Sequence, residues 1–268
     1  WSDTMMAGDG HVEADSPQLL AAAESFGEFA VMAIELIAER RADPQNDLIS
    51  ILTQAFDDGA LTKEHKAIQG VSDEDRVKMA ETGNGLNDDE LLAFLTVLMV
   101  AGNETTRNAI AWGLNLLTDH PGQRAISAAD FEGVAQTAVE EIVRLASPVT
   151  YMRRTALADT ELGGQRIAAG DKVAMYYLAA NRDEAVFDRP YDFDVRRDPN
   201  PHVAFGGPGP HFCLGAHLAR REITVMFREL FRQLPDIRAA GEPDLLSSSF
   251  IHGVKHLRAE FTPTAPSR

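Results

Sequence analysis

The only cysteine of this 268-residue chain, Cys213, follows a stretch with three glycines and two prolines. Glycines carry no side chain and prolines restrict the backbone, so residues 206–210 predict a stiff loop across which a large ligand can approach the sulfur. Residues 214–230 predict a helix that begins beside the sulfur. The unpaired amides and the positive dipole at its N-terminus favour a thiolate over a thiol. A thiolate presented in this way suits the axial position of a metal.

Two other interpretations of Cys213 remain open from the thiol alone. A free cysteine is more often a buried, inert side chain than a ligand. The thiol could also be the nucleophile of a cysteine hydrolase, with His211 or His217 as the base. That reaction needs an oxyanion site and an acid that orients the base, and the sequence suggests neither. The glycine- and proline-rich setting therefore favours a metal ligand.

Residues 205–222 resemble the haem-binding loop and the following helix of the cytochrome P-450 family. The resemblance implies that Cys213 is the proximal thiolate ligand of haem iron, and that Phe205, Gly206 and Gly215 belong to the haem-binding loop. Phe205 stands eight residues before the cysteine, where the family usually has its aromatic residue seven before. This longer form resembles a bacterial subgroup that oxidises sterols and methyl-branched lipids.

A long helix is predicted well upstream of the cysteine. Residues 88–119 predict one helix of roughly 30 residues and ~45 Å, and its apolar first half predicts a place in the centre of a domain. The apolar run extends for about a dozen residues and ends at Asn103 and Glu104, whereas a membrane span needs about 20. We therefore expect no membrane span.

Residues 101–106, in the middle of this helix, resemble the oxygen-activation motif of the family. Ala101 and Gly102 are small enough for a flat ligand to lie against the helix, and Ala101 is a predicted cofactor contact. The Thr105 hydroxyl can bond to a carbonyl one turn earlier and bend the helix. An acid beside an alcohol in an apolar surround can relay protons, so Glu104 and Thr105 are the predicted catalytic pair. A plain polar interruption is the simpler interpretation of these six residues alone.

Glu-x-x-Arg pairs share one helix face, and the chain has them at 104/107, 141/144 and 229/232. Most such pairs are exposed and contribute well under ~1 kcal/mol. Only Glu141 and Arg144 precede residues 147–149 and a strand-rich region, as the corresponding pair of the resembled family does. In that family the pair locks the fold behind the cysteine loop. We therefore expect Glu141 and Arg144 to form a structural pair.

The family usually completes this lock with an arginine, and the corresponding position here is Asp192. Arg196 or Arg197, further along the chain, is a candidate to take its place. The third partner of the lock stays open at this stage.

The resemblance also places two partners for the haem propionates, Arg154 and His211. Carboxylates in a haem pocket need cations or strong donors, because an unpaired charge away from water is costly. For His211, a loop histidine with its own hydrogen bonds is an equal alternative. An apolar substrate needs apolar and aromatic pocket walls, and the candidates, each of which could equally be core, are Val97, Ala101, Val149, Tyr151, Met152, Phe250 and Ile251.

The composition limits the partners and the location. Forty-one acids against 25 bases give a net charge of −16, which argues against nucleic acid or an anionic membrane surface as a partner. Arg220 and Arg221 are placed to meet an acidic electron-transfer protein, although a solvated helix face is the default interpretation. One cysteine allows no internal disulfide, and no leading segment resembles a signal peptide. We therefore expect a cytoplasmic protein.

The expected fold is mainly α-helical with a small β-sheet region, namely the C-terminal two thirds of the cytochrome P-450 fold with its long central helix over the haem. Short alternating runs such as residues 172–177 and 250–261 predict the strands. Residues 1–268 are expected to form a single haem-binding domain that lacks the N-terminal part of the family. The polar residues 62–85 predict a surface insertion.

The leading hypothesis is a haem-thiolate monooxygenase that inserts one oxygen atom of dioxygen into a C–H bond of an apolar lipid, sterol or terpenoid. Its cofactor would be haem b, iron protoporphyrin IX. NAD(P)H would supply electrons only indirectly, through a ferredoxin or flavodoxin and its reductase, because the chain has no flavin or dinucleotide fingerprint. The alternative is a non-catalytic or incomplete haem-binding or sensor protein.

Overall fold

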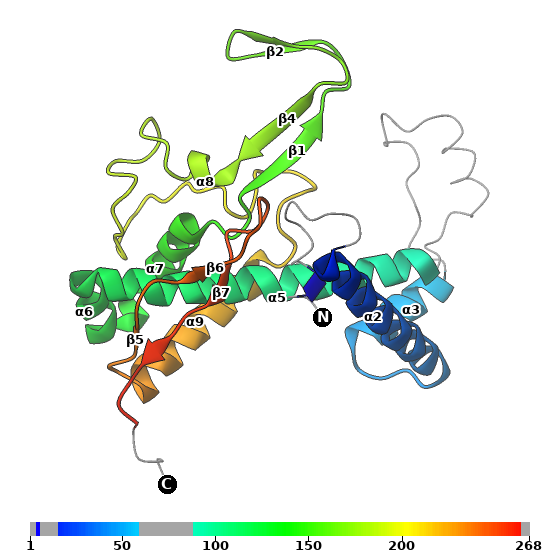
Figure 1. The fold of residues 1–268 in the computed structure, drawn as a ribbon, viewed down its shortest axis with the longest axis horizontal. Coiled ribbons are helices and arrows are strands. Elements are labelled where there is room, and N and C mark those ends of the chain that lie inside the picture. The colour runs from blue at the N-terminus through cyan, green and yellow to red at the C-terminus, as the bar shows by residue number, and fades with distance from the viewer. Residues whose placement is uncertain (1–3, 6–15, 59–87, 264–268) are drawn as a thin grey trace. The chain divides into compact units, whose positions relative to one another are not determined.

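The computed structural model describes residues 4–5, 16–58 and 88–263 (Figure 1). The predicted insertion, residues 62–85, lies outside this part of the chain. The described chain divides into two compact units. The first contains residues 4–5, 16–58, 88–101 and 155–173, and the second contains residues 102–154 and 174–263.

Helices dominate the described chain, and its strands are short. The elements are α2 Pro17–Ala42, α3 Leu48–Asp57, α5 Asp88–Asp119, α6 Pro121–Ala129, α7 Phe131–Ala146, β1 Tyr151–Thr155, β2 Thr160–Leu162, β3 Gln165–Ile167, β4 Lys172–Tyr176, α8 Tyr177–Ala180, α9 Ala216–Gln233, β5 Arg238–Ala239, β6 Asp244–Leu245, β7 Val254–His256 and β8 Ala259–Glu260. The strands pair in twos: β1 with β4, β2 with β3, β5 with β8 and β6 with β7. This confirms the predicted class, mainly α with small sheets. None of the described helices has the length and apolar character that crossing a membrane requires.

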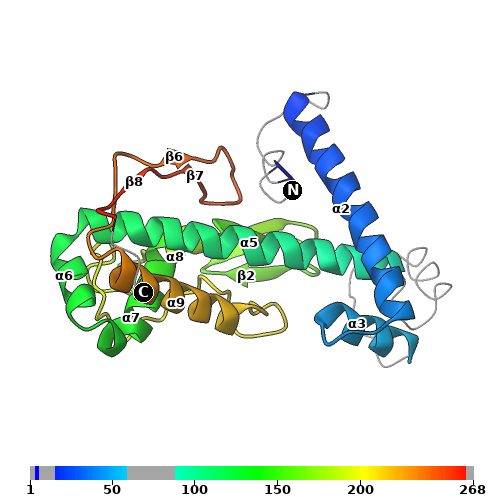
Figure 2. The same cartoon turned by 90° about the horizontal axis from the view of Figure 1, so that it is seen from below.

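The first unit is built on α2 and α3, which pack against each other (Figure 2). Ser16 caps α2, because its Oγ accepts a hydrogen bond from the amide of Leu19 at 3.2 Å. The apolar core of this unit includes Phe29, Ala33, Ile37, Leu91 and Leu95. Val97 lies on the same half of α5 and is 61% exposed. Within the first unit, therefore, only one stripe of the apolar half of α5 is buried.

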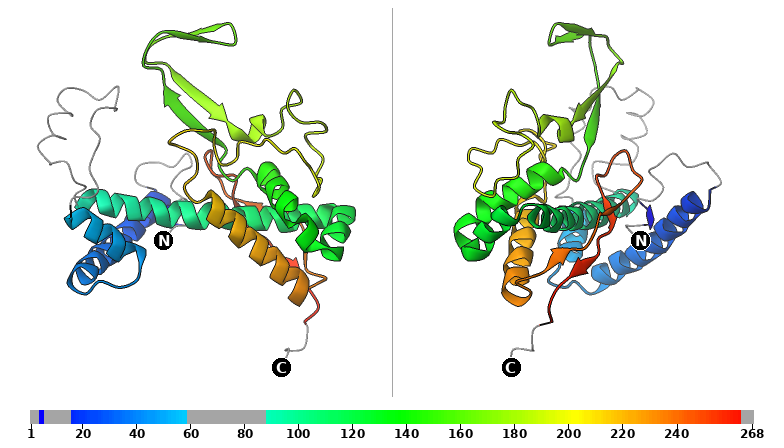
Figure 3. Two further views of the ribbon diagram at one scale, coloured as in Figure 1. Left: turned by 180° about the vertical axis from the view of Figure 1, so that it is seen from behind. Right: turned by 60° about the vertical axis from the view of Figure 1, so that its left-hand side comes forward.

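The second unit has one apolar core shared by α6, α7, α9 and the part of α5 that follows residue 101. Its buried side chains include Ala109, Leu117, Val134, Ala138, Val139, Ile142, Val143, Leu145, Phe193, Val195, Ile223 and Phe227. α9 crosses α5 (Figure 3), and a Cβ atom at Gly113 of α5 would lie only 2.7 Å from Cζ of Phe227 on α9. The crossing therefore requires a residue without a side chain at position 113.

Capping interactions fix both ends of α7. At the start, the Asp130 side chain accepts a hydrogen bond from the Gly133 amide at 3.0 Å. At the end, Ser147 takes a left-handed conformation with φ of 38°. Its Oγ donates to the carbonyl of Arg144 at 2.7 Å and accepts from Nδ2 of Asn181 at 2.8 Å. These bonds hold the C-terminal turn of α7, which carries Arg144, in a defined place.

Replacing Gly113 with Ala is expected to lower the free energy of unfolding by about 1–3 kcal/mol, because the added methyl group overfills the contact with Phe227 and Ile142. Gly122→Ala on α6 is the control, since a Cβ atom there meets nothing within 4 Å. Denaturant titration measures both values. A Gly113→Ala protein that is as stable as the control would contradict this packing.

Candidate functional site

Cys213 ends a loop that hydrogen bonds turn back on itself. The Cys213 amide donates to the carbonyl of Phe205 at 2.9 Å, and the Phe212 amide donates to the carbonyl of Gly209 at 3.1 Å. Gly206 and Gly209 have φ of 84° and 134°, where residues with side chains are strained. The two glycines therefore allow the turns that bring Phe205 and Cys213 together, eight residues apart in the sequence.

The surroundings of Cys213 are open and apolar. The thiol is free and the residue is exposed, and the neighbouring Phe212 and Leu214 are 44% and 81% exposed. A Cβ atom at Gly207 or Gly215 would meet nothing within 4 Å. One soft sulfur donor on an open apolar surface fits haem iron, which takes a single axial ligand from the protein on one face.

α9 begins directly after the loop. The sequence predicts a helix from residue 214, and the observed helix starts two residues later, at Ala216, with Gly215 as its N-cap. The Ala216 amide donates to the carbonyl of Cys213 at 3.3 Å, and the Ala219 amide donates to that of Gly215 at 2.9 Å. The positive end of α9 therefore lies beside Cys213.

Glu141 and Arg144 form a fully buried ion pair on α7, and both side chains are 0% exposed. Nε and Nη2 of Arg144 donate to the two carboxylate oxygens of Glu141 at 2.7 and 2.8 Å. Nη1 of Arg144 donates to the carbonyls of Asn181 and Pro190 at 2.8 and 2.6 Å. The pair thus joins α7 to the segment that leads toward the cysteine loop.

Arg197 is the third partner that the sequence left open. Its Nε lies 3.1 Å from each carboxylate oxygen of Glu141, and its side chain is only 9% exposed. Asp192, at the position of the usual arginine, contributes its carbonyl, which accepts from both Arg144 and Arg197 at 3.1 Å. Arg196, the other candidate, is exposed.

The other two Glu-x-x-Arg pairs also form, in different surroundings. Glu229 and Arg232 pair at 2.6 Å on the surface of α9. Glu104 and Arg107 pair at 2.5 Å on α5, where the Glu104 side chain is 1% exposed and that of Arg107 is 41% exposed. Spacing alone therefore predicts the pairing, and tertiary contacts decide which pair is fully buried.

The predicted catalytic pair lies on α5. Glu104 is buried, and its carboxylate accepts from Nδ2 of Asn103 at 3.1 Å and from Nη2 of Arg107 at 2.5 Å. Thr105, the next residue, is half-buried, and Ala101 is exposed one turn earlier. The buried carboxylate is thus linked through Arg107 to the protein surface.

Sequence reasoning missed the side chains that attach the segment after Phe250 to α5. Trp112 stacks on His252 with ring centroids 4.4 Å apart, and its Nε1 donates to the carbonyl of His252 at 3.0 Å. The buried Asn108 donates to the carbonyl of Glu104 and accepts from the amide of Val254, both at 2.8 Å. Burial lowers the pKa of His252, while its contact with a backbone carbonyl acts in the opposite direction. These partners lie 140 and 146 residues apart, so no local pattern marks them.

Most of the predicted pocket side chains come together in the second unit. Tyr151 lies 5.3 Å from Tyr176 and 6.3 Å from Phe250, measured between ring centroids. Met152 follows Tyr151 and is half-buried. Val149 forms a β-bridge with Ile251, and Ile251 is only 3% exposed. Val97 belongs to the first unit.

The predicted propionate partners are both accessible. Arg154 and His211 are exposed, and the contact of Arg154 is with the carbonyl of its neighbour Arg153, at 3.0 Å. Both side chains can therefore reach a carboxylate without breaking a buried ion pair.

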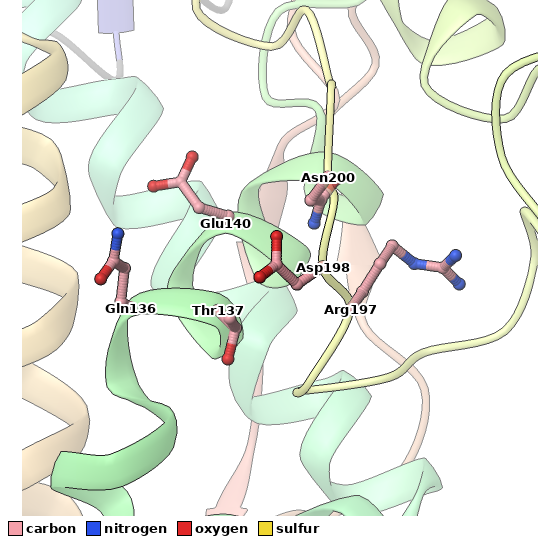
Figure 4. A pocket seen from close by; sticks show the side chains of 6 residues that line it. All are labelled: Gln136, Thr137, Glu140, Arg197, Asp198 and Asn200. Carbon is pink, nitrogen blue, oxygen red and sulfur yellow. The ribbon is translucent and has the colours of Figure 1, made fainter.

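A cavity of about 270 Å³ lies elsewhere in the second unit, beside α7 (Figure 4). Its lining is polar, and consists of Gln136, Thr137, Glu140, Arg197, Asp198 and Asn200. In Figure 4 the Arg197 guanidinium points away from Glu140. A polar lining does not suit a hydrocarbon, so this cavity is not the predicted substrate pocket.

Replacing Arg144 with Ala is expected to lower the free energy of unfolding by about 3–5 kcal/mol, because the variant leaves the buried carboxylate of Glu141 without its bidentate partner. Arg232→Ala, which removes the same group from the exposed pair with Glu229, is the control and should change stability little. Denaturant titration compares the two variants, and equal losses of stability would contradict the assigned role of the buried pair.

Comparison with known proteins places the chain among relatives. The family model described as Cytochrome P-450 matches residues 21–126 and 133–234. The methyl-branched lipid omega-hydroxylase of Mycobacterium tuberculosis is 45% identical over 258 residues, which cover 96% of this chain and 54% of that protein. The steroid C26-monooxygenase of Mycolicibacterium smegmatis is 37% identical over 262 residues, or 98% of this chain and 54% of that protein.

A solved structure shows the same fold. The structure of a Mycobacterium marinum cytochrome P-450 in complex with pseudoionone has a TM-score of 0.80 at 41% sequence identity, and the match covers 97% of this chain and 57% of that chain. The predicted fold family is therefore confirmed. The chain spans about half the length of the curated relatives it matches.

Proposed function

Because the chain belongs to the cytochrome P-450 family, we propose that it carries the haem-thiolate centre of a monooxygenase that inserts one oxygen atom of dioxygen into a C–H bond of an apolar substrate. The observation that carries this proposal is the exposed Cys213 thiol at the end of its hydrogen-bonded loop, beside the first turn of α9. We also propose that residues 1–268 act as a single haem-binding domain, with residues 62–85 as a surface insertion.

Cys213 would hold haem b through its thiolate, and Arg154 and His211, whose side chains are cationic or polar, would bind its propionates. Haem supplies the redox-active iron that activates dioxygen. Phe205, Gly206 and Gly215 would shape the loop surface that binds the haem, because they bend and close the loop. Ala101, which is small and exposed on α5, leaves room for a flat ligand.

Glu104 and Thr105 would deliver protons during oxygen activation. Glu104 is buried, and its contact with the partly exposed Arg107 gives the carboxylate a path to solvent. Thr105 adjoins it on α5 with a hydroxyl that can pass a proton on. The support is the placement of an acid and an alcohol next to each other on a helix that also carries the small residue Ala101.

The substrate would be an apolar lipid, sterol or terpenoid. The support is chemical: the rings of Tyr151, Tyr176 and Phe250 form an aromatic group in the second unit. The relatives' names point the same way, since one acts on methyl-branched lipids and another on steroids. Electrons from NAD(P)H would arrive through a ferredoxin or flavodoxin and its reductase, in the cytoplasm.

Replacing Cys213 with Ala should abolish the red-shifted absorption band that carbon monoxide gives with thiolate-ligated ferrous haem, because no other described side chain replaces the sulfur at the end of this loop. His217→Ala, at an exposed position four residues further on, should keep the band. Absorption spectra of the reduced, haem-loaded proteins provide the measurement. An unchanged band in Cys213→Ala would refute the assigned ligand.

Product analysis separates the monooxygenase from a non-catalytic haem protein. The haem-loaded protein is incubated with a ferredoxin, its reductase, NAD(P)H and a panel of methyl-branched lipids, sterols and terpenoids. The proposal predicts a product that gains one oxygen atom from labelled dioxygen. A normal thiolate spectrum with no oxygenated product from any of the three classes would favour the non-catalytic alternative.

Replacing Thr105 with Ala should divert reducing equivalents into peroxide or water, because the relay beside Glu104 is broken. Thr96→Ala is the control, since Thr96 lies on the same helix and its hydroxyl bonds to the carbonyl of Leu92 at 2.8 Å. The ratio of oxygenated product to NAD(P)H consumed measures the coupling. Normal coupling in Thr105→Ala would remove this residue from the relay.

A further inference from the structure

Glu140, the residue before the buried Glu141, forms a second network that faces the cysteine loop. Its carboxylate accepts from Nε and Nη2 of Arg220 at 2.5 and 2.9 Å, and from Nε2 of His202 at 2.8 Å. Burial acts to raise the pKa of Glu140. The hydrogen bonds from His202 and Arg220 outweigh this effect and lower the pKa to about 2. Glu140 is therefore a negatively charged anchor at neutral pH.

Arg220 connects this anchor to the ring of Phe205. Its guanidinium carbon lies 4.3 Å from the centroid of the Phe205 ring, which is within the range of a cation–π contact. A planar guanidinium can stack on a ring and grip a carboxylate with its fork at the same time. The position of Arg220 over Phe205 is thus fixed by its two bonds to Glu140.

Phe205 is in turn bonded to Cys213, because its carbonyl accepts a hydrogen bond from the Cys213 amide at 2.9 Å. Holding Phe205 in place therefore also restrains Cys213. Arg220 stands seven residues after Cys213, and its Nη1 lies 3.5 Å from the carbonyl of Ala216 in the first turn of α9. The hydrogen bonds to Glu140 raise the pKa of Arg220. The Arg220 side chain therefore contacts Glu140, the ring of Phe205 at the start of the loop, and the first turn of α9 after the loop.

We propose that Arg220, held by Glu140, is a positioning residue that clamps Phe205 and thereby fixes the loop that presents the Cys213 sulfur. The two adjacent glutamates of α7 then hold different segments. Glu141 holds the chain before the loop through Arg144 and Arg197, whereas Glu140 holds the loop itself. Arg220, which the sequence suggested as a contact for an electron-transfer protein, also binds Glu140 and stacks on Phe205 within this chain. That the loop holds haem rests on the proposed function. That Arg220 fixes the loop does not depend on it.

The chain offers a matched control on the same two helices. Arg228 of α9 forms a two-pronged ion pair with Glu132 of α7, two turns beyond Arg220. Arg220→Gln and Arg228→Gln therefore remove the same charge from the same helix, and each leaves a glutamate of α7 without its arginine. Only the first removes the clamp on Phe205.

The first measurement needs no haem. Hydrogen exchange followed by mass spectrometry reports the protection of residues 205–215, which includes the amide of Cys213. We expect roughly fivefold faster exchange of this segment in Arg220→Gln, the factor that one cation–π contact of ordinary strength supports, and no change in Arg228→Gln. Equal exchange in the two variants would overturn the proposal.

The second measurement uses the haem-loaded protein. The ratio of thiolate-free to thiolate-bound ferrous carbon monoxide complex should rise about fivefold in Arg220→Gln for the same reason, and the reduction potential should shift, while Arg228→Gln keeps both. A wild-type protein without the thiolate band would refute the proposed function, and the hydrogen-exchange result would still decide the clamp.

Two further variants separate stacking from charge, and they decide the question if Arg220→Gln does not fold. Arg220→Lys keeps the charge but loses the planar fork, so its loop should exchange faster than that of the wild type. Phe205→Leu keeps the ion pair and removes the ring, and Arg220→Lys should then have little additional effect, because the two changes break one contact. Full rescue by lysine, or additive effects of the two substitutions, would overturn the proposal.

Discussion

The fully buried ion pair of Glu141 and Arg144 is the constraint on which the site depends. Two charges without solvent contact are costly unless every remaining hydrogen-bonding position has a partner, and here each has one. The carboxylate is bonded by Arg144, Arg197, Asn200 and the amide of Asp194. Because so many bonds converge on one carboxylate, the path of residues 181–200 past α7 has little freedom.

This fixed path leads directly into the loop that presents Cys213. The same segment contributes Phe193 and Val195 to the apolar core of the second unit, so packing and ion pairing hold the same stretch of chain. The loop is then closed by the bond between Phe205 and Cys213, and α9 continues into the same core through Ile223 and Phe227. The exposed sulfur is thus attached on both sides to rigid structure, as a metal ligand requires.

The sequence predicted the features that depend on interactions between near neighbours in the chain. The long helix α5 has the predicted bounds, because the acidic residues Asp88, Asp89 and Glu90 favour a helix N-terminus and the apolar spacing continues from there. The helix after the cysteine begins two residues late, since Gly215 acts as its cap. The pairing of Glu141 with Arg144 follows from their spacing of three residues.

The features that the sequence could not predict are contacts between residues far apart in the chain, which depend on its path in three dimensions. Choosing Arg197 over Arg196 as the third partner requires the course of the main chain around Asp192. Glu140 was overlooked because its partner Arg220 is 80 residues away, and the contact of Trp112 with His252 is equally remote in sequence. For Ile251 the sequence left a pocket wall and the core as equal alternatives, and its burial depends on contacts that no local pattern contains.

X-ray absorption at the iron edge of the haem-loaded ferric protein tests the central claim most directly, because it counts the sulfur atoms bound to the metal. The account predicts one sulfur neighbour, and the loss of that neighbour when position 213 carries no thiol. A first coordination shell of only nitrogen and oxygen in the unaltered protein would contradict it.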